Sequence, residues 1–123
     1  MVNNILFIMI GGASGATLRY IANLYIPKLI NSSLPLSTLI VNFFGSFFFG
    51  IIWSMFESKP DSWIQYLFLV GFAGALTTFS TYSFESVQML RDHEYFNAGL
   101  NIVLNNVICI SAIFIGLKIP KLL

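Results

Sequence analysis

Residues 62–84, SWIQYLFLVGFAGALTTFSTYSF, decide the fold of this chain because they contain no charged side chain. About 20 apolar residues in a helix cross the ~30 Å hydrocarbon core of a bilayer, and this stretch is long enough. Two further uncharged stretches run from Leu29 to Phe56 and from Tyr95 to Leu117. A fourth apolar run, interrupted only by Arg19, covers Met1 to Ile26. The sequence therefore predicts an all-α integral membrane protein with four transmembrane helices.

The composition favours the same class. Of the 123 residues, 57% are hydrophobic and 9% are charged, whereas an average soluble domain carries about 25% charged residues. The net charge of +1 indicates no nucleic-acid partner. Cys109 is the only cysteine, which excludes an internal disulfide and provides too few thiols for a zinc site.

Turn-forming and charged residues place the helix boundaries. We expect Pro27 to end the first helix, because proline has no backbone N–H and disrupts a helix interior. A polar turn, Glu57 to Asp61, separates the second helix from the third, and the charged loop Arg91 to Glu94 separates the third from the fourth. Four spans put both termini on one side, within a single domain over residues 1–123. The expected helices cover residues 4–25, 36–56, 63–90 and 96–119.

The basic residues are divided evenly between the two ends of the predicted bundle. Basic residues in short loops normally set the orientation of a membrane protein, so an even division favours insertion in both orientations. A chain that inserts both ways can form an antiparallel homodimer, although the free terminal amine favours a single orientation. Lys59, Lys118 and Lys121 lie on the side of the termini, and Arg19, Lys28 and Arg91 lie toward the other side.

Polar side chains in the second and fourth helices recur every four residues and therefore share one face of each helix. Such groups usually face a bundle interior or a watery path. They are neutral hydrogen-bonding groups, which suits an anion that binds partly dehydrated and must leave again. Hydrogen bonding between helices is the alternative role. The residues are Thr38, Asn42 and Ser46 in the second helix and Asn101, Asn105 and Cys109 in the fourth.

The first helix carries small residues and one charge. Gly11 and Gly15 have the small-xxx-small spacing that lets helix backbones approach closely, so we expect them to pack against another helix. Arg19 follows one turn later. Its long side chain either extends to the membrane interface or attracts anions at a pore mouth.

The third helix contains two glycines and five serine or threonine hydroxyls between Gly71 and Ser83. Glycine and β-branched threonine are poor helix formers, so this segment predicts a broken third helix. Freed carbonyls together with hydroxyls make an all-oxygen site, which suits a hard cation such as sodium. A kinked helix whose hydroxyls bond to the preceding turn is the alternative.

Phe79 and Tyr82 lie three residues apart and share a face of the segment after this break. The edge of an aromatic ring is electropositive, so ring edges can contact an anion without a charge that would trap it. Glu85 is the one acid within a predicted span, and it is either a proton-coupling group or a helix-packing acceptor.

Three blocks of sequence match a known family in order and spacing: Gly11 to Tyr20, Thr38 to Ser46 and Gly74 to Tyr82. The chain resembles the small bacterial fluoride channels of the Fluc or CrcB type. The resemblance implies an antiparallel, dual-topology homodimer in the bacterial cell membrane. Such a dimer has two pores for passive fluoride export, and a structural sodium ion lies at its centre.

The resemblance also implies residue roles. Gly74 and Thr77 would give backbone carbonyls to the sodium, and Phe79 and Tyr82 would form an aromatic box around the anion. Arg19 would lie in the aqueous vestibule, and Glu85 matches an acid of the family's third helix. The remaining pore residues would be Thr38, Asn42, Ser80, Thr81, Asn101, Asn105 and Cys109.

The chain departs from the family pattern at a few positions. Tyr82 replaces a usual Phe, and Ala75 stands where a second Gly is frequent. The fourth helix carries Asn101, Asn105 and Cys109 in place of more usual hydroxyl residues. Some members of the family work as pairs of unlike subunits, and these departures leave that arrangement open.

Two other functions compete with a channel. A small multidrug-type, proton-coupled exporter also has four spans, but it needs a membrane-embedded carboxylate in its binding chamber. The first helix here has no acid, and only Glu85 is available. An enzyme is not expected, because His93 is a lone histidine in a loop and no nucleophile–base pair is present.

Overall fold

The computed structural model describes residues 2–59 and 62–122, and within these ranges its regular elements are all helices. Four segments are long and apolar enough to cross a membrane, namely Val2–Leu29, Leu36–Phe56, Gln65–Arg91 and Tyr95–Lys121. The prediction of an all-α chain with four such helices is confirmed. The elements are α1 (Val2–Leu29), α2 (Leu36–Phe56), the π-helix η1 (Gln65–Ala73), α3 (Gly74–Leu76), α4 (Phe79–Arg91), α5 (Tyr95–Lys118) and the 3-10 turn η2 (Ile119–Lys121).

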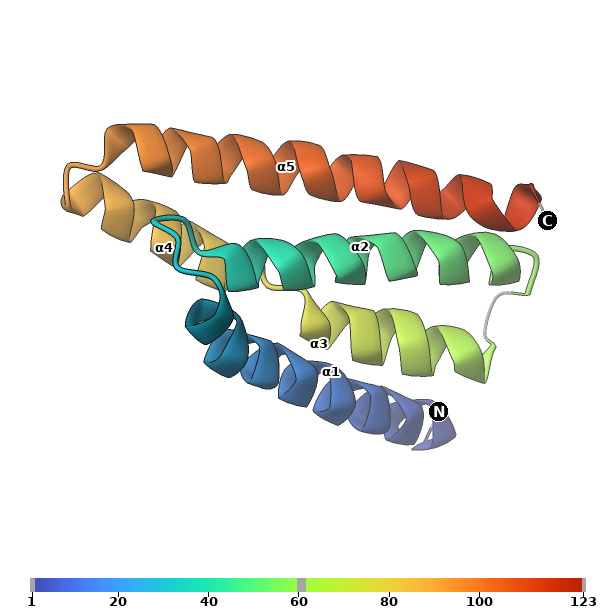
Figure 1. Ribbon diagram of the computed structural model, residues 1–123. Helices are drawn as coiled ribbons and strands as arrows, with labels where there is room; N and C mark the ends of the chain where they lie inside the picture. The colour runs from blue at the N-terminus through green and yellow to red at the C-terminus, as the bar shows by residue number, and fades with distance from the viewer. Residues whose placement is uncertain (1, 60–61, 123) are drawn as a thin grey trace.

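The helices form an elongated bundle in which α5 runs along α2, and α1 runs along η1 and α3 (Figure 1). Both termini lie at the same end of the bundle, as expected for four spans (Figure 1). The loops between α1 and α2 and between α4 and α5 lie at the opposite end. Gly50 and Gly116 let α2 and α5 approach closely, because a Cβ on either would press on the backbone of the other helix.

The helix boundaries agree with the sequence except at the end of the first helix. α2 has the predicted bounds, whereas α1 continues through Pro27 to Leu29. Proline removes one backbone donor, and near the end of a helix this loss affects a single turn. Ile30 N still donates to Ile26 O at 2.9 Å, so the last turn closes around the proline. Pro60 and Asp61 of the predicted polar turn lie outside the described residues.

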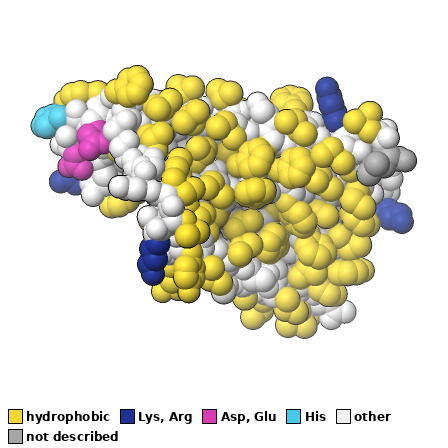
Figure 2. All heavy atoms as spheres, viewed as in Figure 1, with side chains coloured by type: hydrophobic (Ala, Val, Ile, Leu, Met, Phe, Trp, Pro, Cys, Tyr) yellow, Lys and Arg dark blue, Asp and Glu magenta, His cyan; other side chains and the backbone are white. Residues whose placement is uncertain are grey.

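The surface of the bundle is apolar along its length and charged at its ends. Hydrophobic side chains cover the visible face, and the charged side chains gather at the two ends (Figure 2). Large side chains such as Phe44, Phe84 and Phe114 are exposed. An exposed apolar surface of this extent matches a lipid environment.

Glycines bring α1 into backbone contact with η1 and α3. Gly11 and Gly15 are buried, and a Cβ on Gly11 would overlap the carbonyl of Leu67 and lie 2.8 Å from the backbone N of Phe72. From the other side, a Cβ on Gly71 would lie 2.8 Å from the carbonyl of Ile8. The predicted packing role of the small-xxx-small pair is therefore confirmed.

Gly11→Ala is expected to lower the free energy of unfolding by about 1 to 3 kcal/mol, because the added methyl has no room against the η1 backbone. Gly12→Ala is the matched control, since a Cβ there meets nothing within 4 Å. Thermal unfolding in detergent compares the two variants. Equal stability of both would contradict the close contact between α1 and η1.

Candidate functional site

The third span leaves helical geometry at two threonines. Thr77 (φ −74°, ψ 153°) and Thr78 (φ −149°, ψ 109°) are extended, and α4 begins at Phe79. Thr78 is the N-cap of α4, because its Oγ1 accepts a hydrogen bond of 3.1 Å from Thr81 N. Threonine is a preferred N-cap residue, so the local sequence supports a helix start at this point.

The side chain of Asn42 on α2 pairs with the backbone of Thr78. Thr78 N donates to Asn42 Oδ1 at 2.7 Å, and Asn42 Nδ2 donates to Thr78 O at 3.3 Å. Asn42 is 8% exposed and Thr78 is 5% exposed. Buried backbone groups inside a membrane must be paired. The Asn42 amide pairs with the Thr78 N–H, which has left the helix, and also bonds to the Thr78 C=O, which as the N-cap carbonyl begins α4.

These bonds divert the donors that would serve Gly74 and Thr77 in a continuous helix. A helical Thr78 N–H would reach the Gly74 carbonyl, and a helical Thr81 N–H would reach the Thr77 carbonyl. Here Thr78 N donates to Asn42, and Thr81 N donates to the Thr78 side chain. The carbonyls of Gly74 and Thr77 therefore lose their helical donors, and they are the two carbonyls that the resemblance assigns to sodium. These carbonyl oxygens therefore fit a hard cation.

A chain of amides extends from Asn42 across three helices. Asn42 Nδ2 donates to Asn105 Oδ1 at 3.0 Å, Asn105 Nδ2 donates to Asn101 Oδ1 at 2.9 Å, and Asn101 Nδ2 donates to Ser86 Oγ at 3.0 Å. The amide nitrogen of Asn42 thus serves two acceptors, Thr78 O and Asn105 Oδ1. Hydrogen bonding between helices, one of the two roles considered for these stripes, is present here.

A cavity of about 370 Å³ lies beside the two extended threonines, and none of the described residues that line it is charged. The rings of Phe79 and Tyr82 meet edge to face at 5.3 Å on its wall. Phe79 is 77% exposed and Tyr82 only 9%. The predicted site residues Asn42, Gly74, Thr77, Phe79, Tyr82, Asn105 and Cys109 all line this cavity, together with Ser46 and Asn106.

Asn106 and Thr78 are residues of this site that the sequence analysis did not single out. Asn106 Nδ2 donates to the hydroxyl of Tyr82 at 3.2 Å and to Ile102 O at 2.7 Å. Asn106 does not share the four-residue spacing of Asn101 and Asn105. The Tyr82 hydroxyl could have indicated it, because a buried tyrosine hydroxyl usually has a hydrogen-bond partner and Asn106 is a polar residue of the adjacent helix.

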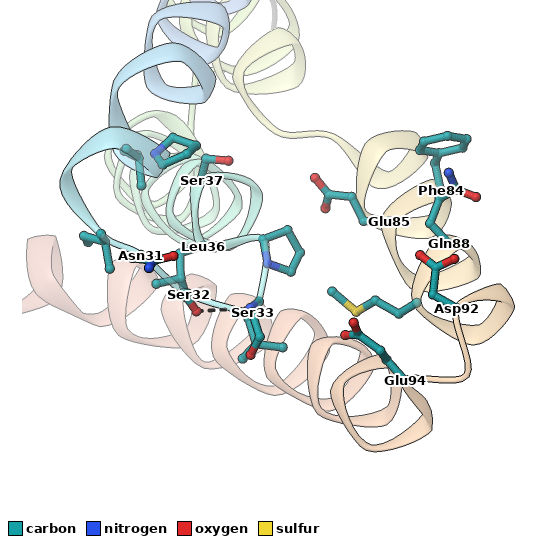
Figure 3. A pocket seen from close by; sticks show the side chains of 16 residues that line it. Asn31, Ser32, Ser33, Leu36, Ser37, Phe84, Glu85, Gln88, Asp92 and Glu94 are labelled. Atoms are coloured by element: carbon teal, nitrogen blue, oxygen red, sulfur yellow. Dashed lines mark hydrogen bonds between the residues drawn. The ribbon is translucent and has the colours of Figure 1, made fainter.

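A second cavity of about 540 Å³ lies where the loop between α1 and α2 meets α4. Glu85 projects into it from α4 (Figure 3). Thr38 Oγ1 donates to Glu85 Oε1 at 2.7 Å. Since Thr38 lies one turn from Asn42 on α2, one polar face of α2 extends from this second cavity to the first.

The other predicted site residues lie apart from the two cavities. Ser80 and Thr81 lie in the first turn of α4, and their hydroxyls bond with Thr78 Oγ1 at 3.3 and 2.9 Å. Arg19 is half-buried on α1 and lines neither cavity. The predicted site is therefore concentrated at the junction of α2, α4 and α5.

Four apolar helices, an interrupted third span and an uncharged polar cavity define a small multi-pass membrane protein. A comparison of sequences then identifies the family. The model for the CrcB-like proteins, described as Camphor Resistance (CrcB), matches residues 6–117, and the chain belongs to this family.

Relatives with an assigned name are similar over almost the whole chain. A fluoride-specific ion channel FluC of Shewanella woodyi is 40% identical over 94% of both chains, and that of Shewanella halifaxensis is equally similar. The FluC of Shewanella sp. strain ANA-3 is 37% identical over the same share. The chain is thus a multi-pass bacterial membrane protein of a non-enzymatic channel family, and the multidrug-type alternative is not favoured.

Asn42→Asp is expected to lower the free energy of unfolding by about 3 kcal/mol. The carboxylate still accepts from Thr78 N, but it loses both donor bonds and faces the oxygens of Thr78 and Asn105. Thermal unfolding in detergent measures the effect, with Asn31→Asp in the exposed loop as the matched control. If Asn42→Asp and the control unfold alike, the Asn42 pairing does not hold the interrupted span together.

Proposed function

We propose that this protein is a fluoride-selective channel through which fluoride leaves the cytoplasm passively. The observation that carries the proposal is the uncharged cavity lined by polar side chains and by the aromatic residues Phe79 and Tyr82. The names of the similar proteins, fluoride-specific ion channels, support the same anion.

The lining suits an anion that must pass rather than stay. Fluoride is small and strongly hydrated, so a narrow path must replace its water with several hydrogen-bond donors. Ring edges of Phe79 and Tyr82 add a weak positive potential, and no lysine or arginine among the described lining residues would trap the ion. Binding without a full opposing charge is what conduction requires.

The proposed route follows the polar face of α2 between the two cavities. Glu85 and Thr38 lie at its outer end, and Asn42, Tyr82 and Cys109 lie at its middle. Asn42 contributes mainly by holding the third span open, since its amide nitrogen already serves Thr78 and Asn105. Asn101 and Asn105 hold α5 in register with α2 and α4. Ser80 and Thr81 provide hydroxyls at the start of α4, and Arg19 attracts anions at the vestibule.

The proposed assembly is an antiparallel homodimer of dual topology with two pores and a sodium ion at its centre. Gly74 and Thr77 would hold the sodium through backbone carbonyls whose helical donors are diverted. A bound cation there would fix the two interrupted spans and add positive potential near the path. The even division of basic residues supports insertion in both orientations.

Fluoride efflux from liposomes that contain the purified protein tests the proposal. A fluoride electrode is expected to record rapid release, whereas chloride-loaded liposomes release no chloride. Failure of well-folded protein to release fluoride would contradict a channel made of this chain alone. Restored release on adding an unlike subunit from the same bacterium would replace the homodimer with a paired assembly, and proton-driven dye uptake would indicate an exporter.

Cys109 provides a test of the route, because it lines the central cavity and is the only cysteine of the chain. A methanethiosulfonate reagent added to the liposomes is expected to abolish most fluoride efflux, since the attached group fills the cavity. Cys109→Ser is expected to be insensitive to the reagent. Complete labelling, verified by mass spectrometry, with undiminished efflux would exclude this cavity from the route.

A further inference from the structure

The hydrogen bonds of Asn106 fix the direction of the Tyr82 hydroxyl. The Ile102 carbonyl only accepts hydrogen bonds, so the group that faces it at 2.7 Å must be the amide nitrogen of Asn106. The same nitrogen lies 3.2 Å from the Tyr82 oxygen. Asn106 therefore donates to Tyr82, and the phenol oxygen acts as the acceptor.

A phenol that accepts on one side has its own hydrogen left for another acceptor. Among residues 2–59 and 62–122, no protein group receives this hydrogen. Tyr82 and Asn106 both line the central cavity. The free O–H is therefore available to an acceptor that enters this cavity.

We propose that Asn106 is a positioning residue that holds Tyr82 as a hydrogen-bond donor to a small, hard anion in the central cavity. The inference rests on the proposed function and adds a donor that the ring edges alone do not provide. Hydrogen bonds to charged acceptors are shorter and stronger than neutral ones. The contact therefore favours fluoride over chloride, because fluoride is the smaller anion and the stronger acceptor.

Tyr82→Phe removes only the hydroxyl and is the sharpest test. The fluoride concentration that gives half-maximal efflux is expected to rise about tenfold, the effect of losing one hydrogen bond to a charged group. The maximal rate is expected to stay the same or to increase, because weaker binding eases exit. A merely structural hydroxyl would leave the half-maximal concentration unchanged.

Asn106→Leu tests the positioning step. The half-maximal concentration is expected to rise less than in Tyr82→Phe, because the hydroxyl is present but no longer oriented. In the Tyr82→Phe background, Asn106→Leu is expected to add nothing, since the two residues act through one hydrogen bond. Asn97→Leu is the matched control, because Asn97 lies on α5 and its amide donates to the exposed Glu94 among the described residues, away from Tyr82. Independent, additive effects of the two substitutions would overturn the positioning role.

A spectroscopic measurement tests the same contact without any flux. Fluoride added to the detergent-solubilised protein is expected to shift tyrosine ultraviolet absorption to longer wavelength, because the phenol then donates to an anion. The shift is expected to be absent in Tyr82→Phe and with chloride. Absence of the shift in the wild-type protein overturns the inference even where fluoride efflux is normal. A shift without efflux supports the inference and contradicts the proposed channel function.

Tyr82→Phe, which is close to isosteric, keeps the test valid if Asn106→Leu fails to fold.

Discussion

The pairing of Asn42 with the backbone of Thr78 is the interaction on which the rest of the site depends. Extended backbone in the middle of a membrane span leaves the Thr78 N–H without its helical partner where water does not reach it, at a cost of several kcal/mol. One side-chain amide from α2 accepts from this N–H and also donates to the Thr78 carbonyl. Because this partner is present, the third span can leave helical geometry at Thr77 and Thr78 and resume as α4. The loss of helical donors at Gly74 and Thr77 and the position of Phe79 at the start of α4 follow from this break in the helix.

The same amide joins the helices that surround the cavity. Asn42, Asn105, Asn101 and Ser86 form a continuous chain of hydrogen bonds from α2 through α5 to α4. A network whose members are all paired specifies one arrangement of its helices, whereas an unpaired member would be costly in this environment. The network therefore sets the shape of the cavity, and Tyr82, Phe79 and Cys109 are left on its wall.

Backbone contacts at glycines provide the frame for this arrangement. Gly11 and Gly71 bring α1 against η1, and Gly50 and Gly116 bring α2 against α5. The association of helices in lipid relies on close packing and hydrogen bonds rather than on the exclusion of water. The small residues thus hold the two helix pairs, and the polar network joins them at the interrupted span.

The sequence by itself determined the class of protein, the four spans and the faces on which Thr38, Asn42, Asn101 and Asn105 lie. Hydropathy and helical periodicity are properties of a single segment and need no knowledge of its neighbours. The path of α1 through Pro27 was predicted wrongly, because one lost bond near a helix end is tolerated in the folded chain. Only the tertiary structure decided that Asn42 pairs with the Thr78 backbone and that Asn106 donates to the Tyr82 hydroxyl. A hydrogen bond between helices depends on which helices are adjacent and on their register, and these are set by the packing of the whole bundle.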